Sequence, residues 1–185
     1  MNSTHNISNY NKVAIAGTHS VGKTTLVRKI TEKIPHLKLI PEFAREIIDL
    51  TGLDWRSEKD INKLLEFQNL ILQYQIFCHT TIECGFVADR TVFDTLTYAL
   101  YHDLRLKVDD CRIYTTLLKY VNEVNLFENP PYDVILIYDL PKGYDDPAGH
   151  FIHHVLRHIL KGVNCRKIAI KRGDRILYYD KVIVV

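Results

Sequence analysis

The chain has 185 residues, of which 46% are hydrophobic and 25% are charged. This length and composition suit one globular domain with a well-buried core and are short for two. The 24 lysines and arginines nearly balance the 22 acidic residues, so the formal net charge is only +2. Such a balance argues against nucleic acid or an anionic membrane as the main partner.

Four cysteines are scattered along the chain without a Cys-x-x-Cys pair, and no apolar run approaches the length needed to span a membrane. Residues 1–11 form a polar leader that lacks the apolar stretch of a signal peptide. We therefore expect a flexible leader, reduced thiols, no membrane association and a cytoplasmic protein. The sequence does not decide the oligomeric state, and a homodimer is left open.

From residue 12 onwards, short apolar runs alternate with helical patterns. The first half predicts a strand, a helix, a second strand and two further helices, at residues 12–17, 22–34, 37–40, 42–50 and 57–84. Pro35 ends the first of these helices, Gly52 lies just beyond the second, and a capping box starting at Ser57 is expected to open the third.

The second half continues the alternation. Strands are predicted at residues 85–89, 133–139 and 167–170, with two helical stretches after the first and one helix, ending near residue 160, before the last. The tail is ambiguous, because Asp174 suits a helix cap whereas Val182–Val185 suits a strand. The pattern predicts one α/β domain over residues 12–185, with a three-layer, doubly wound, parallel sheet of five strands.

A phosphate-binding loop follows the first predicted strand. The motif Gly-x-x-x-x-Gly-Lys-Thr is carried by Gly17, Thr18, His19, Ser20, Val21, Gly22, Lys23 and Thr24, with Thr25 next. In such a loop the backbone N–H groups and the helix N-terminus face the phosphates. Lys23 is then expected to reach the β- and γ-phosphates of ATP, and the Thr24 hydroxyl to bind Mg²⁺.

Acidic residues end two of the apolar strands. Asp89 is the expected metal-side carboxylate, and Asp139 is the alternative, although strand-end aspartates also serve as helix caps. Glu42 follows the second strand, where the carboxyl ends of parallel strands gather around a cleft, so its carboxylate can orient an acceptor hydroxyl. Arg45 lies three residues later on the same helical face, so Glu42 and Arg45 are expected to bind the acceptor together, through a hydroxyl and a phosphate or sugar.

The long third helix carries an unusual amide. Gln68 falls within an apolar stripe that also holds Leu64, Leu65 and Ile71. A buried amide needs hydrogen-bond partners, which the base of a ligand would supply, while backbone groups or solvent are the other explanation.

Three short motifs in matching order resemble the deoxyribonucleoside kinases and the related ribosylnicotinamide kinase-like ATP-binding proteins. They are Pro41–Arg45, Phe67–Gln68 and Asp89–Thr91. The resemblance implies that Glu42 is the general base on the acceptor hydroxyl, that Phe67 and Gln68 contact the acceptor base, and that Arg90 contacts phosphate. It covers the chain from Gly17 to about Gly173 and implies that Gly173–Arg175 lies against adenine.

A lid is expected at about residues 142–162, since small kinases commonly close such a segment over the phosphates. It is similar to an Asp-Asp-Gly-x-Arg pattern of the ribosylnicotinamide kinase-like group, but Pro147 replaces the glycine and Gly149 stands where the arginine is expected. Arg157 would then supply the missing charge, helped by Lys161. Histidines at 150, 154 and 158 share a helical face but lack a carboxylate or cysteine at metal-ligand spacing, which favours a solvated or phosphate-facing helix.

Two aromatic residues are candidates for the acceptor pocket. Tyr98 lies one helical turn beyond Asp94, and Trp55 can stack on a base from its loop, although core packing explains most tyrosines. Together these features predict an ATP-dependent phosphotransferase that acts on a nucleoside-like or nucleotide-like small molecule.

Two alternatives stay open. One is a regulatory ATPase or nucleotide-binding switch; the chain lacks the Asn-Lys-x-Asp segment of a GTP-specific switch, and an AAA-type machine would need an arginine finger from a second domain. The other is a 5′-kinase of nucleic-acid ends, which would use a basic groove around Arg166, Lys167, Lys171 and Arg172. The modest net charge makes nucleic acid the less favoured partner.

Overall fold

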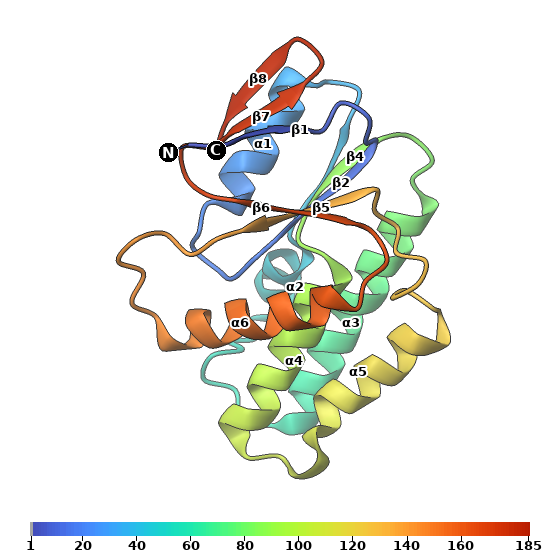
Figure 1. Cartoon of the computed structure of the whole chain (residues 1–185). Coiled ribbons are helices and arrows are strands. Elements are labelled where there is room, and N and C mark those ends of the chain that lie inside the picture. Colours follow the sequence, from blue (N-terminus) through green and yellow to red (C-terminus); the bar gives the residue numbers. More distant parts are fainter. Residues whose placement is uncertain (1) are drawn as a thin grey trace.

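The computed structural model describes residues 2–185 and shows an α/β protein built on a parallel sheet (Figure 1). The strands are β1 Thr4–Asn6, β2 Lys12–Ala16, β3 Lys38–Ile40, β4 Phe86–Asp89, β5 Val134–Tyr138, β6 Arg166–Ile170, β7 Arg175–Tyr178 and β8 Lys181–Val184. The helices are α1 Lys23–Lys33, α2 Phe43–Thr51, α3 Ile61–Thr81, α4 Val92–Leu106, α5 Arg112–Glu123 and α6 Pro147–Lys161, with a short 3₁₀ turn, η1, at Asp109–Cys111.

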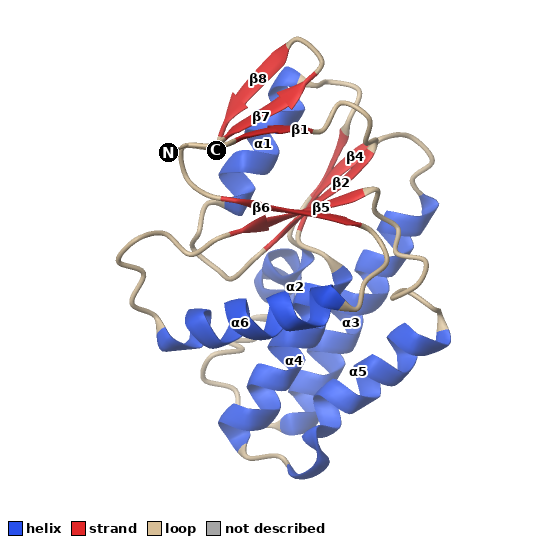
Figure 2. Ribbon diagram, viewed as in Figure 1, coloured by secondary structure: helices blue, strands red, loops and turns tan. Residues whose placement is uncertain are grey.

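The main sheet has five parallel strands, as the sequence predicts, and their order is β3-β4-β2-β5-β6. Figure 2 shows α1 on one side of this sheet and the other helices on the opposite side. The order reverses direction at β2, because β4 pairs on one side of it and β5 on the other. In a doubly wound sheet this reversal opens a crevice at the carboxyl ends of the strands. The phosphate loop leaves β2 at this point.

Successive residues of the central strands pack on opposite faces of the sheet. Ala14, Ala88 and Ile135 face a core made with α2 to α6, whereas Ile15 and Leu136 face a core made with α1. All these strand residues are fully buried, which is the pattern of a parallel sheet covered on both sides. The prediction of three layers is confirmed.

A second, three-stranded sheet in the order β1-β7-β8 covers the outer side of α1. The expectation of a flexible leader is therefore corrected, because Thr4–Asn6 pairs with Arg175–Leu177 and Ile7 is fully buried. The ambiguous tail forms the β7–β8 hairpin rather than a helix. Asp174 does not cap a helix; its carboxylate accepts from the backbone N–H groups of Ser3 and Lys171.

Helix α3 begins and ends at residues other than those expected from the sequence. Its N-cap is Asp60, which accepts from the backbone N–H groups of Asn62 and Lys63, whereas Ser57 bonds to Asp54 instead of opening the helix. The helix ends at Thr81, three residues before the expected end.

All four cysteines are free thiols. None of the helices in residues 2–185 combines the length and hydropathy that a membrane span requires.

Candidate functional site

A cavity of about 470 Å³ opens at the carboxyl edge of the sheet. It is lined by residues from the phosphate loop, the start of α1, the β3–α2 turn, the α2–α3 loop, α3 and α4. They are His19, Ser20, Gly22, Lys23, Thr24, Thr25, Glu42, Ala44, Arg45, Ile48, Trp55, Arg56, Phe67, Gln68, Ile71, Gln75, Arg90, Thr95 and Tyr98. One hollow thus joins the expected phosphate site to the expected acceptor site.

The phosphate loop has the backbone that its motif predicts. Gly17 and Gly22 have φ angles of +150° and +106°, and Ser20 is left-handed at +60°. Gly22 leads directly into α1, so the loop ends at a helix N-terminus. Val21 is buried against the core beneath α1 and anchors the loop.

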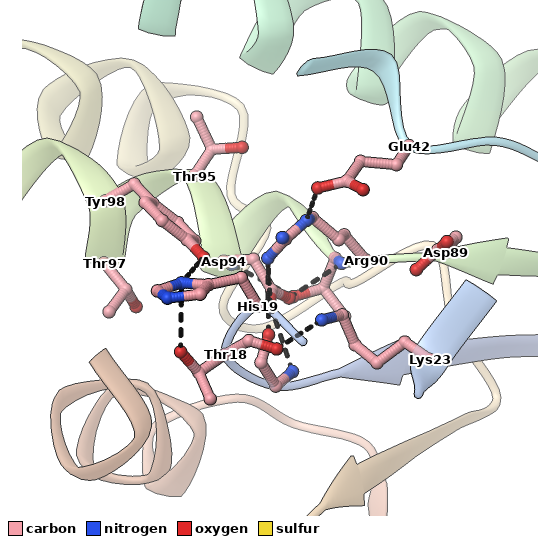
Figure 3. A network of polar contacts seen from close by, with 12 residues as sticks. Thr18, His19, Lys23, Glu42, Asp89, Arg90, Asp94, Thr95, Thr97 and Tyr98 are labelled. Atoms are coloured by element: carbon pink, nitrogen blue, oxygen red, sulfur yellow. Dashed lines mark hydrogen bonds and ion pairs between the residues drawn. The ribbon is translucent and has the colours of Figure 1, made fainter. Parts of the chain in front are cut away.

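Lys23 bends back onto its own loop. Its Nζ donates to the carbonyl oxygen of Thr18 at 2.5 Å, and the side chain is buried (Figure 3). Burial and the nearby charge of Arg90 lower the pKa of Lys23 to about 7, although Asp94, Asp89 and Glu42 act in the opposite direction. The ammonium has no carboxylate within salt-bridge distance among the described residues, so an incoming phosphate would supply its counter-charge.

Thr24 and Asp89, the two residues expected on the metal side, contact each other directly. The Thr24 hydroxyl donates to Asp89 Oδ2 at 2.5 Å. Asp89 Oδ1 is buried and lacks a hydrogen-bond partner within residues 2–185. Burial raises the pKa of Asp89, against the opposing effects of Thr24 and Lys23. An unpartnered buried carboxylate oxygen beside a threonine hydroxyl fits the oxygen ligands that Mg²⁺ takes.

Arg90 lies at the centre of the site. Its Nε donates to Glu42 Oε1 at 2.5 Å, one Nη donates to the Gly17 carbonyl at 3.3 Å, and the same nitrogen lies 3.6 Å from Asp94 Oδ1. The guanidinium also lies 5.0 Å from the ring centre of Tyr98. The backbone of Arg90 is left-handed, with φ +98°, which costs energy for a residue with a side chain. This turn directs the side chain between β3 and the phosphate loop.

Asp94 also belongs to the site, although its position in the sequence does not indicate a functional role. Its Oδ1 accepts from the Gly17 N–H at 3.1 Å, and its Oδ2 accepts from the N–H and hydroxyl of Thr91. Thr91 and Asp94 form a capping box at the start of α4. That Thr-x-x-Asp spacing is visible in the sequence, but its contact with the phosphate loop is not.

Glu42, expected to orient an acceptor hydroxyl, lines the cavity and faces Arg90. Burial alone would raise the pKa of Glu42, but the charges of Arg90 and Lys23 outweigh burial and lower it. Glu42 is therefore an ionised carboxylate at neutral pH. Arg45 contacts its other oxygen at 3.5 Å and is mostly exposed, at the mouth of the cavity.

The far end of the cavity is lined by amides and aromatic rings. Gln68 is buried, lines the cavity and makes no side-chain hydrogen bond within the described chain. Gln75, one of the deepest lining residues, accepts from the Thr95 hydroxyl at 2.7 Å. Trp55 lies edge-on to Tyr98, and Arg56 stacks on the outer face of Trp55 at 4.4 Å. The sequence gives no signal for Thr95 or Arg56.

Other expected residues lie away from the cavity. The expectation that Arg157 supplies charge to the site is not met in this structure, because its guanidinium pairs with Asp139 at 2.5 Å and lies outside the cavity lining. Asp139, the alternative metal-side carboxylate, is held in this pair and lies outside the cavity lining. Gly173–Arg175 is held by the small sheet, with Gly173 N–H bonded to Val185 and Arg175 N–H to Ser3. Within residues 2–185, no group of three His, Cys, Asp or Glu side chains is arranged to hold a metal.

Comparison with known families decides the chain's membership. The family model described as an AAA domain, AAA_28, matches residues 12–175. The chain belongs to this family of P-loop domains. No curated protein matches its sequence.

Solved structures share the fold at low sequence identity. The NadR protein in complex with NR matches with a TM-score of 0.64 and 19% identity, over 91% of this chain and 43% of NadR. NadR in complex with NAD and AMP-PNP gives the same TM-score and identity, over 44% of NadR. This chain thus spans less than half the length of NadR.

Deoxyadenosine kinase from M. mycoides with bound dCTP matches with a TM-score of 0.59 and 16% identity, over 86% of this chain and 89% of that enzyme. The resemblance to P-loop nucleoside kinase-like proteins is therefore confirmed at the level of the fold.

Proposed function

We propose that this protein transfers the γ-phosphoryl group of ATP to a hydroxyl group of a nucleoside-like small molecule. The single observation that carries the proposal is that one cavity holds both the phosphate-loop lysine and a carboxylate–arginine pair, and extends beyond them to an amide- and aromatic-lined end. A nucleotide switch that binds only ATP would need the phosphate loop but not the part of the cavity that is lined by amides and aromatic rings.

The donor side is formed by the phosphate loop. Lys23 and the loop N–H groups would bind the β- and γ-phosphates, and the N-terminus of α1 would add its positive dipole end. Thr24 and Asp89 would hold Mg²⁺, which neutralises phosphate charge when bound. Arg90 provides a second positive charge beside the loop, at its contact with the Gly17 carbonyl.

The acceptor side has the groups that phosphoryl transfer requires. The ionised Glu42 would accept the hydroxyl proton of the acceptor as the hydroxyl oxygen bonds to the γ-phosphorus. The bond from that phosphorus to the bridging oxygen of ADP breaks, and ADP leaves with the bond electrons. Arg90 holds the carboxylate in place and keeps it ionised. Such transfer depends mainly on positioning and charge stabilisation.

The chemistry of the far end supports a planar acceptor. Gln68 has a free amide donor and acceptor, which suits the edge of a heteroaromatic base, and Phe67 and Trp55 add apolar aromatic surface to the lining. The buried residues there are uncharged, so we favour an acceptor whose base is neutral.

The deciding experiment incubates the protein with labelled ATP and Mg²⁺ and with a panel of nucleosides, nucleoside monophosphates and ribosides. We expect one class to become phosphorylated, and Glu42→Gln to lose that transfer while still binding ATP. Lys119→Gln, at an exposed lysine of α5 outside the cavity lining, is the comparison and should retain the turnover. Full turnover in Glu42→Gln would remove Glu42 as the base.

A regulatory ATPase is the second candidate function. It is favoured by the matched AAA-domain model and by the pairing of Arg157 with Asp139, which leaves the expected lid without a positive charge at the cavity. Slow hydrolysis of ATP, with no phosphorylated product from any member of the panel, would favour this function over the kinase.

A further inference from the structure

The first turn of α6 is attached to the phosphate loop at one residue, His19. Asp146, the N-cap of α6, contacts His19 Nε2 through Oδ2, while its Oδ1 accepts from the Ala148 N–H at 2.9 Å. The same carboxylate thus caps the helix and bonds to the loop. Near this contact, the Tyr144 hydroxyl donates to the backbone carbonyl of His19 at 3.2 Å.

The Tyr144 contact explains why glycine stands at position 149, where the lid pattern of the resembling kinases has an arginine. The ring of Tyr144 packs directly against Gly149, where an added Cβ would lie 2.0 Å from the Tyr144 hydroxyl oxygen. A side chain at position 149 would therefore displace Tyr144 from the loop. In this chain the place of the expected arginine is taken by a tyrosine that bonds to the phosphate loop.

On its other side, His19 contacts the acceptor end of the cavity. Its Nδ1 lies 3.1 Å from the Tyr98 hydroxyl (Figure 3). The His19 ring also lies edge-on to Trp55. A carboxylate can only accept, so Nε2 carries a proton, and in the neutral imidazole Nδ1 is then an acceptor for the Tyr98 hydroxyl. Burial raises the pKa of Tyr98, which keeps its hydroxyl a donor at neutral pH. Each group in the chain Tyr98–His19–Asp146 has a matching partner.

We propose that His19 is a positioning residue that fastens the start of α6 to the phosphate loop, so that nucleotide bound in the loop stabilises the 142–162 segment. The inference rests on the proposed function only in taking the loop to hold a triphosphate. A residue inside the loop that bonds to a separate helix is displaced whenever the loop changes shape, and the helix responds with it.

The test is hydrogen exchange on the full chain, comparing peptides that cover residues 144–152 with and without Mg²⁺ and AMP-PNP. Loss of the bridge in His19→Ala should speed exchange in the first turn of α6 about tenfold, the effect of one hydrogen bond to a charged group. AMP-PNP should slow exchange there in the wild-type chain and should not do so in His19→Ala. AMP-PNP is added at a concentration that saturates each variant, so that a change in nucleotide affinity does not affect the comparison.

Two further variants separate the bridge from a general loss of structure. Asp146→Ser keeps a good N-cap but is too short to reach His19, so it should match His19→Ala, and the double variant should be no worse than either alone. Gln at position 19 can donate to Asp146 and accept from Tyr98, so His19→Gln should restore the protection. His158→Ala, an exposed histidine of the same helix, is the control and should leave exchange unchanged.

The outcomes distinguish this inference from the proposed function. Unchanged exchange in His19→Ala, or AMP-PNP protection that persists in it, would overturn the bridge even if the protein is a kinase. A wild-type chain that does not bind AMP-PNP would contradict the proposed function instead, and the comparison of the nucleotide-free variants would still decide whether the bridge exists.

Discussion

Arg90 Nε donates to Glu42 Oε1 at 2.5 Å, and the backbone of Arg90 is left-handed, with φ +98°. The ion pair joins β4 to the β3–α2 turn, and the guanidinium is almost fully buried while Glu42 still reaches the cavity. Because burial would otherwise favour a neutral carboxyl, Arg90 is the reason that the proposed base is ionised.

Replacing Arg90 should therefore change the pH dependence of catalysis. In Arg90→Gln, Glu42 loses its main counter-charge and its pKa rises. Because a base acts only when deprotonated, the fall of kcat on acidification should begin at higher pH than in the wild type. A pH profile of kcat checks this, with Arg90→Lys as the variant that keeps the charge. An unshifted profile in Arg90→Gln would mean that Glu42 is not the base.

Glu42→Gln should lower kcat by about 10²- to 10⁴-fold, the usual contribution of a general base, with little change in ATP affinity. Steady-state kinetics and ATP binding by calorimetry measure the two effects. A parallel loss of ATP binding would indicate that the pair with Arg90 supports the phosphate loop rather than the transfer step.

ATP binding should weaken as the pH rises above neutrality. The pKa of Lys23 is lowered to about 7 in the nucleotide-free protein, so the lysine is increasingly neutral above that pH, whereas bound phosphate requires the ammonium. Binding at pH 8 should therefore take up a proton. Calorimetry in two buffers of different ionisation enthalpy detects this uptake, and equal apparent enthalpies would contradict it. In Lys23→Met the uptake should disappear together with most of the affinity.

Asp89→Asn should raise the Mg²⁺ concentration needed for half-maximal activity, because it removes a charged oxygen next to the Thr24 hydroxyl. Asp139→Asn, at the corresponding end of β5, is the matched control, since Asp139 is paired with Arg157 outside the cavity. A Mg²⁺ titration that shows the two variants to be equally affected would argue against a metal role for Asp89.

Two buried histidines should make the fold sensitive to acid. Burial lowers the pKa of His79 and of His102 to about 3, with Arg105 adding to the effect at His102. The unfolded chain binds more protons below pH 6.5, so stability is lost as the pH falls from about 6.5 towards 3, by up to about 1.4 kcal/mol per pH unit for each histidine. Denaturant unfolding at several pH values measures this slope.

His102→Leu should reduce that slope by the share of one histidine. Both ring nitrogens of His102 are buried and lack partners within the described residues, so the substitution should also stabilise the protein at pH 7, by about 1 kcal/mol. His79 differs, because Nδ1 bonds to the Tyr132 hydroxyl at 2.7 Å. If the His102→Leu protein were less stable and its stability depended on pH as in the wild type, His102 would not be the source of the acid sensitivity.

Much of this protein can be predicted from local pattern. The strand–loop–helix context of Gly17–Thr25 predicts both the loop and its position in the sheet, because that geometry lies within one short segment. The three central strands, β2, β4 and β5, are buried on both faces and therefore give continuous apolar runs, whereas the edge strands β3 and β6 are partly exposed and give weaker patterns. The order Glu42, Gln68, Arg90 along the chain also leads to residues that line one cavity.

What could not be predicted depends on contacts between distant segments. The leader looks disordered because its pairing partner, β7, lies about 170 residues later. Asp94 contacts the phosphate loop through the Gly17 N–H, and Arg157 lies outside the cavity lining and pairs with Asp139. The choice of Asp60 over Ser57 as the helix cap depends on how the preceding turn is closed by Asp54.

The small sheet has a practical consequence for handling the protein. Helix α1, whose first residues are Lys23 and Thr24, is held between the main sheet and β1-β7-β8, and Lys29 and Lys33 bond to the backbone of β8. The two chain ends lie next to each other at this sheet (Figure 1). An affinity tag or truncation that disrupts either end would therefore weaken the packing of α1, which carries Lys23 and Thr24. Preparations should be compared with the tag removed before weak ATP binding is ascribed to the site itself.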